Sequence, residues 1–204
     1  MSGNAEDMSE NAEDMSGREL WTGQAVQPSW KQVNMKTREE WRARDTRSSE
    51  YMATPVSIVF IHHTAMSRCH DHTSCCQELK TIQNFHMDDR GWDDIAYNFV
   101  IGENGYVYEA RGWNRVGAHT AGWNNVAIGL SLLGDFSSVE PDPKALDAIR
   151  NLLELGVAEG KISANYKLYG HKDARNTTEC PGQKLYDIIT KWDHYDSSPP
   201  VCPN

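Results

Sequence analysis

The run Val56-Ser57-Ile58-Val59-Phe60-Ile61-His62-His63 is the stretch of the chain that best defines its fold. Its first six positions are almost all apolar, so both faces of the segment suit burial, as in a central strand of a sheet. Successive residues of a strand point to opposite faces, so His62 and His63 cannot both face one ion. We expect one histidine to be a ligand and the other a substrate contact or a hydrogen-bonded core residue.

The segment from Gly170 to Gly182 carries two further ligand-type side chains, His171 and Cys180, in one loop that precedes a helix. Together with His62 they make a set of two imidazoles and one thiolate. Zn²⁺ takes such a set at catalytic sites and leaves the fourth tetrahedral position to water. The alternative is that all three are ordinary buried polar residues, and spacing alone does not decide between the two interpretations.

The rest of the chain intersperses predicted strands with amphipathic helices. The expected elements are a helix from a Ser74–Gln77 capping box to about Asp88, a hairpin of residues 98–101 and 106–109, a buried strand over 126–133, a helix that begins at Asp142-Pro143, and a last helix over about 183–192. This order predicts an α/β fold in a single domain, with a central mixed β-sheet flanked by about three α-helices.

Length and charge limit the classes of function. The 204 residues fit one domain plus a tail. The formal net charge of −9 argues against a nucleic-acid partner, because a phosphate binder normally presents a basic stripe. A membrane span is not expected either, because no window reaches the roughly 18 apolar residues that it requires.

The N-terminal residues contain an acidic repeat, in which Asn4-Ala5-Glu6-Asp7-Met8-Ser9 recurs at 11–16. Such a segment cannot bury enough apolar surface to offset the entropy of ordering it. Its heptad spacing also fits a helix, but only Ala and Met recur at apolar positions, which argues against a coiled coil. We therefore expect residues 1–30 to be a disordered acidic extension, 31–192 to be the folded domain and 193–204 to be an irregular tail.

The five cysteines give conflicting indications of the compartment. Cys69 and Cys75 can close a small disulfide loop, which the adjacent Cys76 cannot easily share. Cys202 can pair with Cys76 or stay free, because connectivity cannot be read from a sequence. A disulfide favours an extracellular location, whereas the polar and acidic N-terminus is not a signal peptide, so a cytoplasmic location stays open.

Seven segments between Lys36 and Trp192 carry a family resemblance. They are residues 38–44, 61–64, 82–87, 91–99, 107–113, 117–124 and 128–131. In this order they resemble the peptidoglycan recognition proteins, whose fold is similar to that of phage-type zinc amidases. The resemblance implies binding of bacterial peptidoglycan or muropeptides in antibacterial innate immunity. Catalytic members are N-acetylmuramoyl-L-alanine amidases, which cut the amide between the lactyl group of N-acetylmuramic acid and the L-alanine of the stem peptide.

The resemblance implies a role for each residue of the candidate centre. The zinc ligands are His62, His171 and Cys180, and Tyr97 is the tyrosine that these amidases need. Tyr97 would stay protonated and donate a hydrogen bond to the water or to the developing oxyanion. Non-catalytic members often carry serine in place of the cysteine, so Cys180 favours an enzyme over the alternative, a non-catalytic receptor or sensor.

The loop of the candidate centre also departs from the family. Cys180 lies nine positions after His171, where eight is usual. Either a bulge around Asn176 absorbs the extra residue, or the cysteine moves out of reach and leaves a binder. Thr178, two positions before the cysteine, is expected as a second catalytic residue, with Thr177 as the alternative.

The resemblance also implies a substrate preference. Arg111 stands where members that prefer diaminopimelate-type peptidoglycan carry arginine, whose planar fork can grip the additional carboxylate at two points. Gly91 and Trp92 match the pair that accompanies the same preference. Further substrate-binding residues expected by position are His63, His86, Arg90, His119 and Asn124. The sequence leaves the oligomeric state open, as well as a third class of function in which the acidic extension is the working part.

Overall fold

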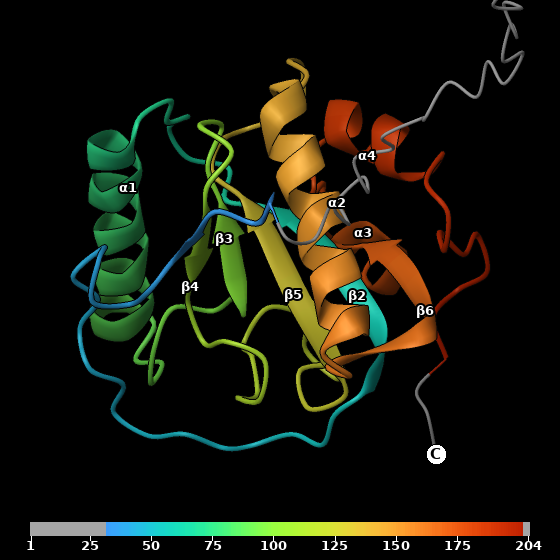
Figure 1. The fold of residues 1–204 in the computed structure, drawn as a ribbon, viewed down its shortest axis with the longest axis horizontal. Helices are drawn as coiled ribbons and strands as arrows, with labels where there is room; N and C mark the ends of the chain where they lie inside the picture. Colours follow the sequence, from blue (N-terminus) through green and yellow to red (C-terminus); the bar gives the residue numbers. More distant parts are fainter. Residues whose placement is uncertain (1–31, 202–204) are drawn as a thin grey trace, which may run out of the picture.

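A computed structural model describes residues 32–201, so the acidic repeat and Cys202 lie outside the described residues (Figure 1). Six strands form one sheet in the order β1-β4-β3-β5-β2-β6. Only β3 and β4 pair antiparallel, and the other neighbours are parallel. The strands are β1 (Met35–Lys36), β2 (Val56–His63), β3 (Phe99–Ile101), β4 (Val107–Glu109), β5 (Ala127–Leu132) and β6 (Ile162–Gly170). The expected α/β fold with a mixed sheet is confirmed.

Strand β2 lies inside the sheet between β5 and β6, as its two-sided apolar pattern predicts. Its side chains alternate between two layers of core. Val59 and Ile61 pack with the helix α2 (Pro143–Ala158), which lies over one face of the sheet in Figure 1. Ile58 and Phe60 pack on the opposite face, so His62 lies on the face that α2 does not cover.

Helix α1 (His72–Asn84) covers part of this second face and continues as a π-helical turn, η2 (Phe85–Asp89). It packs through Leu79 and Ile82 in the same cluster as Val100 of β3 and Tyr108 of β4. Val100 is in register with Ser131 of β5, and Ser131 with His62 of β2. The candidate centre therefore lies on the same face as α1, over the neighbouring strands.

The N-terminus of α1 differs from the predicted one. Its N-cap is Asp71, whose carboxylate accepts from the backbone N–H of Ser74 at 3.0 Å. The Ser74 hydroxyl accepts in return from the backbone N–H of Asp71 at 3.4 Å. The predicted Ser74–Gln77 box is wrong, because Ser74 is already the third residue of the helix and the carboxylate one turn earlier caps it.

Several elements escaped prediction or ended elsewhere. β6 was not predicted, because this edge strand exposes its middle residues and shows no clear apolar period. The two-residue β1 and the short helix α3 (His171–Ala174) were also not predicted. The last helix, α4 (Gln183–Ile189), ends before Trp192, in a turn closed by hydrogen bonds from Lys191 and Trp192.

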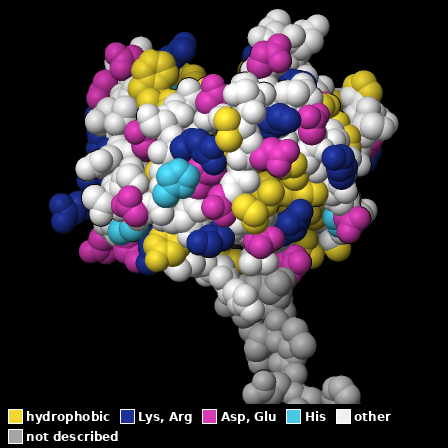
Figure 2. Space-filling model, turned by 90° about the horizontal axis from the view of Figure 1, so that it is seen from above, with side chains coloured by type: hydrophobic (Ala, Val, Ile, Leu, Met, Phe, Trp, Pro, Cys, Tyr) yellow, Lys and Arg dark blue, Asp and Glu magenta, His cyan; other side chains and the backbone are white. Residues whose placement is uncertain are grey.

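The disulfide between Cys69 and Cys75 is present and joins the loop before α1 to its first turns. Cys76 is a free, half-buried thiol. Among residues 32–201, no helix combines the length and hydrophobicity that a membrane crossing requires. On the face drawn in Figure 2, basic and acidic side chains are interspersed, without the continuous basic stripe typical of nucleic-acid binders.

Candidate functional site

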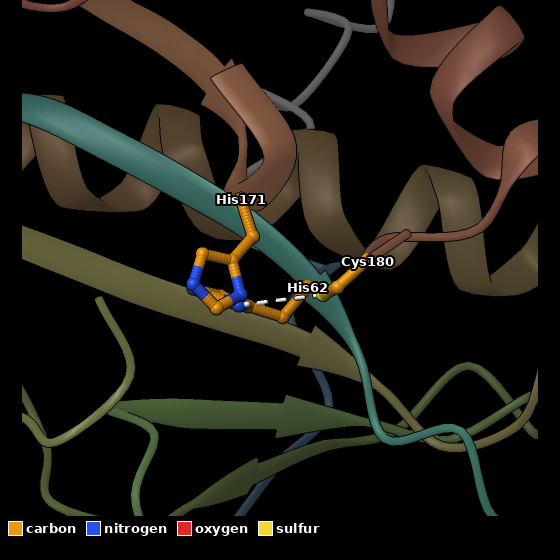
Figure 3. A group of neighbouring side chains, drawn as sticks. All are labelled: His62, His171 and Cys180. Atoms are coloured by element: carbon orange, nitrogen blue, oxygen red, sulfur yellow. Dashed lines mark hydrogen bonds between the residues drawn. The ribbon is translucent and has the colours of Figure 1, made fainter. Parts of the chain in front are cut away.

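Three ligand-type side chains from separate elements converge on one point (Figure 3). One ligand atom each of His62, His171 and Cys180 can be chosen so that all three atoms lie within 4.8 Å of one another. His62 is the penultimate residue of β2, and His171 follows the last residue of β6. Because Ile61 is in register with Gly170, the parallel pairing of β2 and β6 brings the two histidines side by side, with ring centroids 4.7 Å apart.

Cys180 reaches this point from the loop that precedes α4. Its Sγ lies 3.6 Å from Nδ1 of His62, and it accepts from the backbone N–H of His63 at 3.4 Å. The Cys180 carbonyl accepts from the N–H of Lys172 at 2.9 Å, which ties the cysteine to α3. A turn in which the N–H of Thr178 donates to the carbonyl of Arg175 accommodates the intervening residues. The extra residue therefore does not carry the sulfur away from the histidines.

Burial controls the protonation of the three side chains. It lowers the pKa of His62 well below the usual range, with smaller contributions from His119 and His171. Burial likewise lowers the pKa of His171 to about 4, so both imidazoles are neutral at pH 7. It raises the pKa of the Cys180 thiol to about 12, so the thiol keeps its proton until a cation replaces it.

This donor set fits a zinc ion. Two neutral imidazoles and one thiol that a cation can deprotonate are the ligand types found around catalytic zinc with three protein ligands. In contrast, Mg²⁺ and Ca²⁺ prefer oxygen ligands, which none of the three side chains offers.

His63 lies on the opposite face of β2 from His62. Its Nδ1 accepts from the backbone N–H of Phe136 at 3.3 Å and lies 3.7 Å from a carboxylate oxygen of Asp135. The ring is buried on the side of the sheet that α2 covers. The alternation of the strand thus directs one histidine of the pair to the cluster and the other into a hydrogen-bonded position.

Tyr97 lies beside the cluster, two residues before β3. Its ring centroid is 5.5 Å from that of His62. Burial raises the pKa of the Tyr97 phenol above its usual value, so the hydroxyl remains a hydrogen-bond donor at neutral pH. Thr178 lies on the cysteine loop, where its Oγ1 accepts from the backbone N–H of Cys180 at 3.2 Å. That bond fixes the loop, and Thr177 is exposed.

A second group of predicted residues surrounds Arg111. Its guanidinium donates to the carbonyls of Ile95 and Val116, each at 2.7 Å, and of Asp94 at 3.2 Å. The Asp94 carboxylate is itself buried and forms ion pairs with Arg38 at 3.0 Å and Arg115 at 3.2 Å. Burial lowers the pKa of Arg111, but an arginine stays charged in proteins. These hydrogen bonds therefore hold the positively charged guanidinium of Arg111 in a fixed position.

His86 and Trp92 lie near this cation. Their ring centroids are 4.9 Å apart, and Nδ1 of His86 accepts from the N–H of Ala96 at 3.1 Å. Burial, together with the charges of Arg111 and Arg90, lowers the pKa of His86 to about 4. Trp92 is partly exposed, so its ring is available to a ligand.

The loop around Arg90 and Gly91 connects η2 to these residues. Arg90 is exposed, with its guanidinium 5.0 Å from the centroid of the Phe85 ring. Gly91 has a φ of +70°, and a Cβ there would meet no atom within 4 Å. A glycine is therefore favoured at this position by the left-handed backbone conformation, and not by a neighbouring atom that a side chain would meet.

His119 and Asn124 belong to the loop between β4 and β5, which contacts His62 of the cluster. The Asn124 Oδ1 accepts from the backbone N–H groups of His119 and Thr120, both at 2.8 Å. Nδ1 of His119 lies 3.2 Å from Nε2 of His62, and burial lowers the pKa of His119 to about 3. The prediction missed Thr120, whose Oγ1 lies 3.3 Å from the same Nε2. Only its position next to His119 signals it in the sequence.

A hollow that could hold a ligand lies elsewhere on the molecule. It measures about 620 Å³ and is lined by α2, by Ala164 and Tyr166 of β6, and by residues 191–194. None of the predicted site residues lines it. The candidate site is therefore defined by its side chains and not by this hollow.

Comparison with known proteins identifies similar chains. A family model described as N-acetylmuramoyl-L-alanine amidase matches residues 52–183. Peptidoglycan recognition protein 1 of Mus musculus is 45% identical over 159 residues, which cover 78% of this chain and 87% of the mouse protein. A peptidoglycan recognition protein of Trichoplusia ni is 44% identical over 159 residues, with the same two coverages.

Solved structures agree in fold. Wild-type PGRP-LB of Drosophila superposes with a TM-score of 0.79 at 39% identity, covering 80% of this chain and 96% of that one. Peptidoglycan recognition protein LE, solved in complex with tracheal cytotoxin, gives a TM-score of 0.78 at 40% identity with the same coverages. Its ligand is a monomeric, diaminopimelic acid-type peptidoglycan.

Proposed function

The chain belongs to the peptidoglycan recognition protein family, and we propose that it is a zinc-dependent N-acetylmuramoyl-L-alanine amidase of innate immunity. The observation that carries this proposal is the convergence of His62, His171 and Cys180, with their ligand atoms within 4.8 Å of one another. In the proposed reaction water breaks the amide bond between the lactyl group and L-alanine. The lactyl carbonyl becomes a carboxylate, and the stem peptide leaves with a free α-amino group.

The side chains of His62, His171 and Cys180 would hold the metal. When bound, zinc supplies Lewis acidity toward an amide carbonyl and toward water. His62 and His171 enter as neutral ligands, because burial lowers the pKa of both. Cys180 gives up its thiol proton on binding and supplies the single negative charge of the ligand set.

Tyr97 is proposed to stabilise the oxygen that becomes negative during the reaction. It remains protonated because burial raises its pKa, and its ring lies 5.5 Å from that of His62. A preorganised donor of this kind acts more strongly in a buried site than in water. Thr178 supports the reaction from the loop, where its hydroxyl holds the N–H of Cys180.

The proposed substrate is diaminopimelate-type peptidoglycan. Arg111 offers a fixed cation, and its three bonds to carbonyl groups leave further N–H groups for a carboxylate. Lysine-type stem peptides lack the additional carboxylate. The relative that was solved with a diaminopimelic acid-type ligand is 40% identical to this chain, which supports the same preference here. The other expected substrate contacts stay predictions: His63, His86, Arg90, Gly91, Trp92, His119 and Asn124.

The serine variant of the candidate ligand Cys180 tests the proposal. Cys180→Ser should lose most of its zinc, measured by elemental analysis, and all release of stem peptide from a diaminopimelate muropeptide. Cys76→Ser is the matched control, because Cys76 is also a half-buried free thiol but lies on α1. It should keep both properties. A wild-type protein that binds stoichiometric zinc and the muropeptide but shows no turnover would contradict the amidase proposal. The alternative function, a non-catalytic receptor, would then remain.

A further inference from the structure

The ring of His62 presents two different nitrogens to its surroundings. Nδ1 faces the sulfur of Cys180 at 3.6 Å, so Nε2 points away from the candidate metal position. A nitrogen that binds a metal must offer a lone pair, so the ring proton must then sit on Nε2. His62 is only 1% exposed, and a buried N–H needs an acceptor.

Two acceptors lie at the required place. Nδ1 of His119 is 3.2 Å from Nε2 of His62, and Oγ1 of Thr120 is 3.3 Å from it. These two acceptors lie 3.0 Å apart, so the Thr120 hydroxyl can accept from His62 and donate to His119. Both side chains are buried, which keeps water from replacing them.

The backbone keeps these acceptors in place. Gly117 and Gly129 form a slot for the imidazole of His119, because a Cβ at either glycine would collide with the ring. The Asn124 amide oxygen holds the N–H groups of His119 and Thr120, each at 2.8 Å. A side chain with so little freedom can orient another one.

We propose that His119 and Thr120 are positioning residues, which hold the proton of His62 on Nε2 and keep Nδ1 free for the metal. The inference rests on the proposed zinc site. It assigns the Nε2–H tautomer to His119 as well, because Nδ1 of this ring must accept. In this arrangement the buried N–H without a partner among the described residues is the Nε2–H of His119, and not the N–H of the candidate ligand His62. The opposite arrangement would have His119 donate to His62 and place the His62 proton at the metal position.

The tautomers can be read without any variant. Long-range ¹H–¹⁵N correlation spectra of the zinc-free protein at pH 7 should show both rings, His62 and His119, as Nε2–H tautomers. A proton on Nδ1 of His62 in that sample overturns the proposal. Loss of fold is not a concern, because the wild-type chain is measured.

The second test measures the zinc affinity of variants, by competition with a chromophoric chelator. Thr120→Val and His119→Phe should each weaken zinc binding by roughly 10–100-fold, the usual effect of losing a partner of a metal-binding histidine. Thr120→Ser keeps the hydroxyl and should bind zinc as the wild type does. Circular dichroism checks that each variant is folded.

The outcomes separate this inference from the proposed function. Folded Thr120→Val and His119→Phe variants that bind zinc within about threefold of the wild type overturn the positioning role, while the amidase proposal stands. A wild-type protein that takes up no zinc overturns both.

Discussion

At the scale of single residues, burial prepares the candidate centre for a soft divalent cation. It keeps His62 and His171 neutral and the Cys180 thiol protonated, so these three side chains carry no net charge at pH 7 before a cation binds. The resemblance predicted these three residues, and the structure brings them together. It did not predict Thr120 or the buried Asp94, because a partner that acts through a second side chain has no spacing rule in the sequence.

Replacement of Tyr97 tests the proposed oxyanion donor. Tyr97→Phe removes one hydroxyl and should lower the rate of stem-peptide release on the order of 10²–10³-fold, since a buried donor to the developing charge is lost. Zinc content and muropeptide affinity should stay close to the wild-type values. A variant that turns over at the wild-type rate would refute the role of the hydroxyl.

Replacement of Arg111 tests the substrate preference. Arg111→Lys keeps a charge but loses the planar fork, so KM for a diaminopimelate muropeptide should rise about 10–100-fold. KM for a lysine-type muropeptide should change little, and Arg150→Lys, an exposed change on α2, serves as the control. Equal losses on both substrates would instead indicate that Arg111 only supports the carbonyl groups of its loop.

At the scale of elements, the sequence revealed those with a strong apolar period. β2 and β5 were predicted close to their observed bounds and α2 at its observed start, because each buries one or both faces. β6 was missed because, as an edge strand, it exposes Asn165 and Lys167 in its middle. The N-cap of α1 was misplaced by one turn, since Asp71 and Ser74 are both good capping residues and only the geometry distinguishes them.

The disulfide before α1 should contribute to stability. The double variant Cys69→Ala/Cys75→Ala should lower the free energy of unfolding by about 2–4 kcal/mol, because the unfolded chain gains conformational freedom without this cross-link. Urea titration of zinc-loaded samples measures the difference. Cys76→Ala is the control in the same segment, and it should differ little from the wild type. Equal stability of all three proteins would mean that the bond adds nothing to this fold.

At the scale of the whole molecule, the two faces of the sheet are covered differently. α2 closes one face with a continuous apolar core. On the other face α1 packs over β3 and β4, and the cluster of His62, His171 and Cys180 lies beside it over β2 and β6. The class of fold followed from the sequence, whereas a contact between loops, such as the hydrogen bond from Arg111 to the carbonyl of Ile95, leaves no pattern in it.

Buried histidines should make the zinc-free protein sensitive to acid. Burial lowers the pKa of His86 to about 4 and of His119 to about 3, below the value of about 6.5 in an unfolded chain. Between these values the unfolded state binds more protons, so stability is complete above about pH 6.5 and falls as the pH decreases toward 4. Thermal unfolding between pH 7.5 and 4.5 measures this loss.

A variant of His86 tests whether this histidine contributes to the acid sensitivity. His86→Asn retains an acceptor for the N–H of Ala96 but cannot titrate, so its melting temperature should depend less steeply on pH. Gln77→Asn changes an exposed side chain of α1 that carries no titratable group, and it should keep the wild-type slope. A slope unchanged in His86→Asn would exclude His86 as a contributor.

The products of a diaminopimelate muropeptide test the amidase proposal most directly. Mass spectrometry after incubation with the zinc-loaded wild-type protein should show two fragments, a saccharide with a free lactyl carboxylate and a stem peptide that begins with a free L-alanine. A chelator should abolish both fragments, and added zinc should restore them. An intact muropeptide that binds to the zinc-loaded protein, with neither fragment formed, would contradict the enzyme.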